Sequence, residues 1–242
     1  MNGTVARLTA RGLLGRRRAL LLLLLPAVLL SLSAMARGLA GADQQLAVTL
    51  LGGFALGTLV PLLGLIAGTG AIGPEIDDGS IVYLLTKPLN RHAIVVTKFA
   101  VAAAVVTVLG ALPTFAAGLV LTGTSANLAV GYAVGTAVAG VAYCALFLLL
   151  AVVTRNAVVI GLLYALVWET LIGQFVPGAQ ALSIQQWSLA VTERIVGAPA
   201  EQLGATSAVG LATAVVLLVV VTAGATWYAG RQLRTIRLTS EV

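Results

Sequence analysis

The sequence predicts an all-α membrane protein, a bundle of six transmembrane helices accompanied by shorter amphipathic helices. Of its 242 residues, 60% are hydrophobic and only 9% are charged, which is incompatible with a water-exposed surface. The charges cluster between long apolar runs instead of alternating with apolar residues, which favours a helical bundle over an outer-membrane barrel. Residues 1–242 are expected to form a single transmembrane domain.

The first 18 residues are basic, and Arg16, Arg17 and Arg18 directly precede an apolar run that reaches Ala36. Arginines interleaved with leucines predict an interfacial helix on the inner leaflet. The same region has the basic start, apolar core and small residues of a secretory signal peptide. Because five more apolar runs follow, we expect this run to be retained as a first span over about 19–36.

The five further apolar runs predict the remaining spans. They cover about 46–70, 93–121, 128–153, 157–176 and 207–229. The second span contains Gly53-x-x-x-Gly57 and Gly64-x-x-x-Gly68, a spacing that lets helices approach closely, either within the chain or in a dimer. Lys98, near the start of the third span, is expected to snorkel to the interface.

The segment before the last span predicts an external amphipathic helix. Ser183-Ile184-Gln185-Gln186 has the form of a capping box, and Gly197 and Pro199 are stop signals. Its apolar stripe is expected to contain Ile184, Trp187, Val191 and Ile195. A tryptophan there suits the level of the lipid headgroups.

The basic residues predict the orientation. With the N-terminus inside, all but Arg37 and Arg194 of the 14 Lys and Arg residues lie in or beside cytoplasmic segments. These segments are 1–18, 71–92, 154–156 and 230–242. We therefore expect a multi-pass protein of the inner (plasma) membrane with both termini in the cytoplasm.

A polar segment at 73–92 separates the second and third spans. Apolar residues recur in it at spacings of three and four, which predicts a short amphipathic helix ended by a proline. Glu75, Asp77 and Asp78 would lie in its first turn and Lys87 in its last, as the helix dipole favours. The alternative is an ordinary cytoplasmic loop kept in water by its charges.

This segment also resembles a family signature. The order of its residues is similar to that of ABC-2-type transporter permeases. It has an acid at Glu75, the pairs Gly79-Ser80 and Leu84-Leu85, the run Lys87–Arg91 and a following Lys98. The resemblance implies a cytoplasmic coupling helix that docks on a separate ATPase subunit. The residues it assigns to this coupling are Glu75, Asp77, Asp78, Ile81, Tyr83, Leu84, Leu85, Lys87 and Arg91.

In that interpretation the acids meet polar or basic groups of the ATPase, and the apolar side chains insert as anchors. The basic residues contact either the ATPase or lipid phosphates. The resemblance further implies an exporter with two ATPase copies, built on a homodimer or on a heterodimer with a related permease. Membrane lipids are expected partners, and nucleic acid is not.

Several chemistries are excluded by what the sequence contains. Lys87 and Lys98 are the only lysines and each follows a threonine, so there is no P-loop and the chain is not expected to be an enzyme. The lone His92 and the lone Cys144 lie far apart in the predicted topology, which supports neither a metal site nor a Cys/His pair. No cofactor is expected in this chain.

Glu169 is the only acid inside a predicted span. Such a residue could line a substrate path or bind a proton, or it could pack within the bundle or reach solvent from the outer side. A second reading of the whole chain is an ATP-independent secondary carrier or a structural membrane protein. The sequence does not specify the transported substrate.

Overall fold

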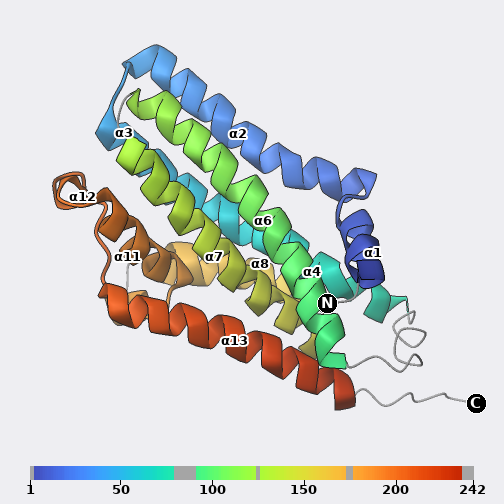
Figure 1. Cartoon of the computed structure of the whole chain (residues 1–242). Coiled ribbons are helices and arrows are strands. Elements are labelled where there is room, and N and C mark those ends of the chain that lie inside the picture. Colours follow the sequence, from blue (N-terminus) through green and yellow to red (C-terminus); the bar gives the residue numbers. More distant parts are fainter. Residues whose placement is uncertain (1–2, 79–90, 124–125, 173–176, 236–242) are drawn as a thin grey trace, which may run out of the picture.

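The computed structural model describes residues 3–78, 91–123, 126–172 and 177–235, and in these ranges the chain is all-helical. Figure 1 shows the long helices lying side by side in one bundle. In chain order the elements are α1 (Gly3–Leu13), α2 (Arg16–Ala40), α3 (Gln44–Thr49), the π-helix η1 (Leu50–Leu59), α4 (Val60–Asp77), α6 (Arg91–Thr122), α7 (Ala126–Val153), α8 (Ala157–Leu163), the π-helix η2 (Tyr164–Ile172), α10 (Pro177–Gln180), α11 (Ile184–Val196), α12 (Pro199–Gln202) and α13 (Leu211–Thr235).

Five helices in the described part are long and apolar enough to cross a membrane. They are Arg18–Ala40, Gln44–Glu75, His92–Thr122, Ala126–Val153 and Leu211–Leu233, at the positions of five predicted spans. At the predicted fifth span the apolar helix Ala157–Glu169 is shorter. Such a helix rises about 20 Å, less than the roughly 30 Å of a bilayer's hydrocarbon core. Residues 173–176, which the prediction included in this span, lie outside the described residues.

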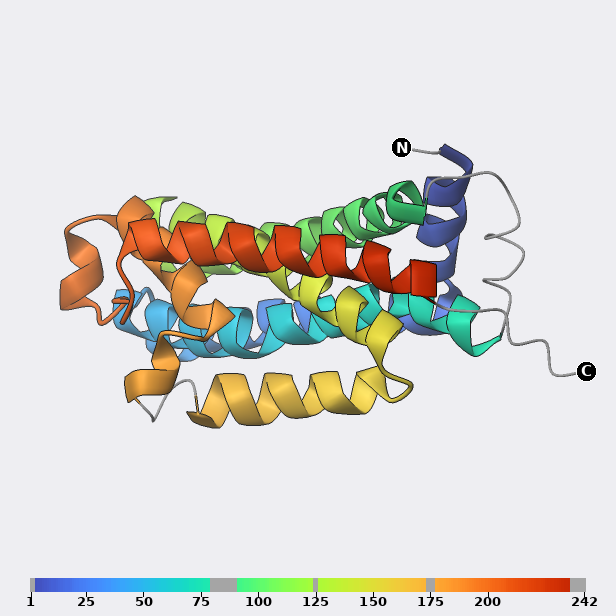
Figure 2. The ribbon, with the colours of Figure 1, turned by 90° about the horizontal axis from the view of Figure 1, so that it is seen from below.

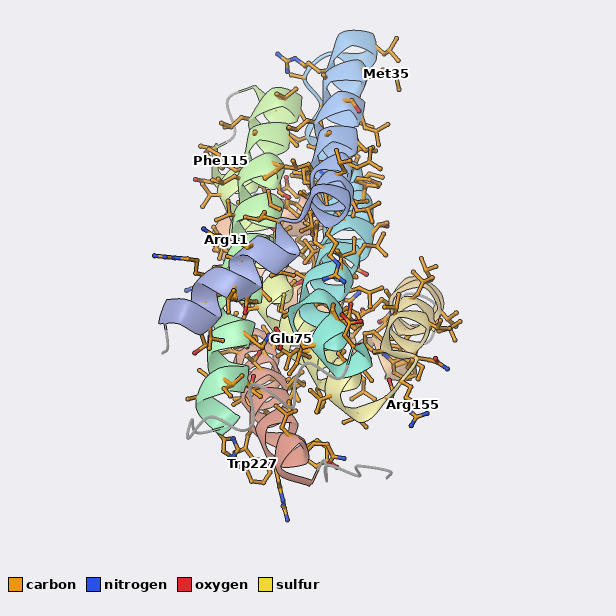
Figure 3. All side chains as sticks on the ribbon, turned by 90° about the vertical axis from the view of Figure 1, so that its right-hand side faces the viewer. Arg11, Met35, Glu75, Phe115, Arg155 and Trp227 are labelled. Atoms are coloured by element: carbon orange, nitrogen blue, oxygen red, sulfur yellow. The ribbon has the colours of Figure 1, made fainter. Side chains whose placement is uncertain are left out.

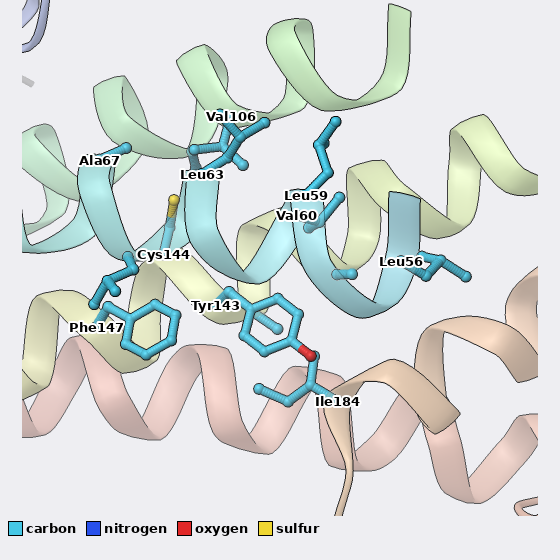
Figure 4. Packing of buried hydrophobic residues seen from close by; sticks show 14 of the residues in the cluster. Leu56, Leu59, Val60, Leu63, Ala67, Val106, Tyr143, Cys144, Phe147 and Ile184 are labelled. Atoms are coloured by element: carbon cyan, nitrogen blue, oxygen red, sulfur yellow. The ribbon is translucent and has the colours of Figure 1, made fainter. Parts of the chain in front are cut away.

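The core of the bundle lies where α4 packs against α7. A Cβ added to Gly64 would come 2.6 Å from Cβ of Tyr143, and one on Gly68 would come 3.0 Å from the carbonyl oxygen of Cys144. Figure 4 shows Tyr143 between α4 and the start of α11. The Gly64-x-x-x-Gly68 pair therefore serves packing within the chain. Gly53, in contrast, faces open space.

Helix α11 begins and ends where the sequence predicts. The Ser183 hydroxyl accepts a hydrogen bond from the Gln186 N–H, and Gly197, with φ of 77°, ends the helix. Of the predicted apolar stripe, Ile184 and Trp187 are buried, whereas Val191 and Ile195 are half-buried. The helix does not lie on the surface of the bundle. It packs against α7 and α13. The buried residues are Ile184, Gln185, Trp187, Ser188, Ala190, Thr192 and Val196.

Close approach to α7 explains this different face. Thr192 Oγ1 donates to the Gly131 carbonyl oxygen at 3.2 Å, and it occupies the place that a side chain on Gly135 would fill. Small polar residues of α11 can face α7 because backbone carbonyls satisfy them. The Trp187 indole, expected among headgroups, is 4% exposed and donates to the Ala181 carbonyl oxygen at 2.8 Å.

The first residues form a helix, α1, as the sequence predicts, and its place at the membrane surface stays a prediction. It buries Val5, Thr9 and Leu13, which share one face, and contacts α6 and α4. Figure 2 shows that α1, the end of α4, the link between α7 and α8, and the end of α13 all lie towards one end of the bundle. We call this end, which carries Arg18, Arg155 and Arg231, the basic end.

Candidate functional site

The candidate site lies at the basic end, where α4 ends and α6 begins, on either side of residues 79–90. Lys98 Nζ of α6 lies 2.6 Å from Oε1 of Glu75 in the last turn of α4. The same ammonium donates to the Ala71 carbonyl oxygen at 2.7 Å. The Lys98 side chain is 1% exposed and that of Glu75 is 29% exposed. One cation thus ties together two helices that are separated in sequence by the segment resembling a coupling helix.

A second cation holds the same end of α4. Pro74 lies inside α4 and has no N–H, so it cannot donate to the carbonyl of Gly70 four residues earlier. Arg18 Nη1, from the first turn of α2, donates to that Gly70 oxygen at 3.2 Å. A Cβ on Gly70 would come 3.4 Å from this nitrogen and 3.2 Å from Leu13 Cδ2 of α1. The guanidinium replaces the hydrogen bond that the proline removes.

These contacts correct two expectations. Lys98 does not snorkel to the interface, since its ammonium is buried against α4. Glu75 and Asp77 do not lie in the first turn of a separate helix, because α4 continues through Pro74 to Asp77. An acid at the C-terminal end of a helix is unfavourable by the dipole alone, and for Glu75 the ion pair with Lys98 offsets this cost. Figure 3 shows Glu75 at this end of the bundle.

Glu169 forms a second polar centre away from the basic end. Its carboxylate is fully buried and accepts hydrogen bonds from the N–H of Ile184 at 3.1 Å and of Gln185 at 3.5 Å. The hydroxyl of Tyr164 donates to it at 3.0 Å, and that of Ser183 donates to its other oxygen. The carboxylate therefore caps the N-terminus of α11, where the first N–H groups lack helical partners and the dipole favours an anion.

The part of the chain that the structure describes holds no group of three or more His, Cys, Asp or Glu residues able to bind a metal ion. Both flanks of residues 79–90 are tied to the bundle, so a force applied to this segment acts on α4 and α6 together.

A comparison with known families matches residues 18–232 to the family model described as ABC-2 family transporter protein. This chain belongs to the ABC-2 transporter family. No curated protein matches it. Permeases of this family are membrane transport components that normally work with an ATPase subunit. With its apolar helices, the chain is a multi-pass membrane protein of this kind.

Only part of the predicted coupling set of this permease can be placed. Asp78 is exposed, and its N–H donates to the Pro74 carbonyl oxygen at 2.9 Å, which extends α4 by one residue. Asp77 and Arg91 lie in α4 and α6, but their side chains are outside the described part. The remaining residues, Ile81, Tyr83, Leu84, Leu85 and Lys87, lie outside the described residues, and their role stays a prediction.

Some residues of the permease's polar centres were missed from sequence. Arg18 was assigned only to the membrane surface, and Ser183 only to its own helix. For Arg18 the available signal was Pro74, because a proline in the last turn of a helix leaves the carbonyl four residues earlier without its helical N–H donor. For Ser183, the available signal was a carboxylate inside a predicted span, 14 residues before the predicted start of α11.

Proposed function

We propose that this permease is the membrane-spanning subunit of an ATP-driven exporter, moved by a separate ATPase subunit that docks on residues 73–92. The observation that carries the proposal is the Lys98 ammonium bound to both Glu75 and the Ala71 carbonyl, which links the two flanks of that segment. ATP-driven closure of the ATPase would push the segment, and this link would pass the motion to α4 and α6.

The complex would contain two ATPase copies and two permease chains, either identical or related. It would lie in the inner (plasma) membrane with both termini in the cytoplasm, as the positive-inside distribution supports. Ile81, Tyr83, Leu84 and Leu85 would be the apolar anchors, and Asp77, Asp78, Lys87 and Arg91 their polar rim. Glu75 would act from within the bundle as a positioning residue. The chain itself would carry no cofactor.

The test begins with the affinity-tagged full chain purified from its native membranes. We expect a P-loop ATPase to copurify and to be identified by mass spectrometry. Leu84→Asp places a charge on a proposed anchor and should abolish copurification. Leu39→Asp is the matched control, because Leu39 is 83% exposed and lies at the C-terminal end of α2, away from the proposed docking segment.

Retention of the ATPase by the Leu84→Asp chain would contradict docking on this segment. Recovery of the wild-type chain without any ATPase would instead favour the second candidate, an ATP-independent carrier or structural membrane protein. Export itself is read out in vesicles as ATP-dependent cargo movement, once ligands that stimulate the ATPase of the complex identify the cargo.

A further inference from the structure

A cavity of ≈ 390 Å³ opens at the basic end between α2, α4 and the link that leads into α8. Arg18 of α2 and Arg155 of the link both line it, although they are far apart in sequence. Its lining also includes apolar side chains, among them Leu65 of α4 and Val158 of α8. The lining therefore combines cationic and hydrocarbon side chains.

The cavity carries positive charge that its own wall does not neutralise. No described residue lining it is an Asp or a Glu. Arg18 uses one of the five N–H donors of its guanidinium on the Gly70 carbonyl. The Arg155 side chain is exposed (Figure 3) and is not part of the ion pair found among the described residues.

Both threonine hydroxyls of the wall are already occupied as donors, and the Asn156 side chain, also in the wall, is exposed. The Thr69 hydroxyl donates to the Leu65 carbonyl oxygen at 2.6 Å, and that of Thr154 donates to the Leu150 carbonyl oxygen at 3.0 Å. The two arginines are the only cationic side chains among the described residues that line the cavity. Guanidinium groups bind phosphate oxygens by paired, charge-assisted hydrogen bonds.

We propose that this cavity binds an anionic membrane phospholipid, with the phosphate between Arg18 and Arg155 and an acyl chain along Leu65 and Val158. Basic pockets between transmembrane helices at the cytoplasmic side bind such headgroups. The amphipathic wall distinguishes a lipid from a free phosphate ion, which would use only the cationic side chains. Because Arg18 also holds the Gly70 carbonyl, the bound lipid strengthens the contact between α2 and α4.

The test uses the full chain in detergent, depleted of lipid and then given phosphatidylglycerol or phosphatidylcholine with identical acyl chains. Native mass spectrometry counts bound lipid, and thermal unfolding reports stabilisation. We expect one retained phosphatidylglycerol and a higher Tm than with phosphatidylcholine. Arg155→Gln, which removes an exposed side chain, should weaken binding by about tenfold to a hundredfold, the loss of one charge-assisted contact.

Two further variants keep the result interpretable. Val158→Trp fills the hydrocarbon part of the lining from an exposed position and should also reduce phosphatidylglycerol binding. Arg194→Gln removes an exposed arginine from α11, away from the cavity, and should change nothing. Equal binding of both lipids, equal loss in the Arg194→Gln chain, or full stabilisation by inorganic phosphate alone would overturn the proposal. No ATPase is needed, so failure here leaves the proposed transport function untouched.

Discussion

Breaking the ion pair between Glu75 and Lys98 should destabilise the permease unequally from its two sides. Glu75→Leu leaves an ammonium that is 1% exposed, whose remaining partner in the described part of the chain is the Ala71 carbonyl, and removing one partner of a buried pair costs about 3–5 kcal/mol. Lys98→Met leaves a carboxylate on a side chain that is 29% exposed, and although its Oε2 is buried, this side chain lies nearer to water than the ammonium does. We expect about 1–3 kcal/mol there, the cost of hydrogen bonds lost to a charged group.

The double variant Glu75→Leu/Lys98→Met separates stability from coupling. Replacing both members of a buried pair by apolar residues is often neutral, so its stability should return close to that of the wild type. If the pair transmits motion from the docked ATPase, ATPase activity in the complex persists while ATP-dependent export falls.

The assay is equilibrium unfolding in mixed micelles of detergent and SDS, together with ATP hydrolysis and export in reconstituted vesicles. For the unfolding measurement alone, Asp78→Asn is the control, because this exposed neighbour should change the free energy of unfolding by no more than about 0.5 kcal/mol. The reasoning is refuted if Lys98→Met destabilises the chain more than Glu75→Leu, or if the double variant exports normally.

Two further predictions concern the other polar contacts. Glu169→Ala should cost about 1–3 kcal/mol in unfolding free energy, because the buried N–H groups of Ile184 and Gln185 lose their acceptor. The control Glu201→Gln changes an exposed side chain and should cost almost nothing. Equal effects of the two variants would contradict the capping role. Pro74→Ala restores an N–H for the Gly70 carbonyl, so Arg18→Gln should be less destabilising in the Pro74→Ala chain than in the wild type, by about 1 kcal/mol. A double-mutant cycle measures this difference. Strict additivity would contradict the idea that the Arg18 guanidinium replaces the missing proline N–H.

Local pattern predicted the helices well because each signal acts within one segment. Apolar runs located five spans to within a few residues, and Ser183 and Gly197 gave both ends of α11 through interactions no more than four residues long. The face of α11 was less predictable. Its orientation depends on room left by glycines in α7, and nothing in the sequence of α11 reports that room.

The site was only partly predictable for the same reason. Glu75 was chosen correctly as a residue of interest, but its partner Lys98 lies 23 residues away, beyond any helical spacing. The end of α4 was misplaced because Gly73 and Pro74 usually stop a helix. Here the helix continues, since Arg18 supplies the donor that the proline lacks. That compensation comes from another helix and has no local signature.

An ionisable group inside a membrane bundle is by default a candidate for substrate or proton binding. The two that the described part of the chain buries, Lys98 and Glu169, are instead bonded to groups of the bundle itself. Lys98 lies beside the C-terminal end of α4 and Glu169 at the N-terminus of α11, so each charge has the sign that the helix dipole favours. Their hydrogen-bonding atoms face backbone groups and the partners Glu75, Tyr164 and Ser183. A cargo reaching either centre would have to displace these partners. We therefore expect Glu169→Gln to leave cargo selectivity unchanged while lowering stability, and a shift in selectivity measured by competition in vesicles would return Glu169 to the substrate path.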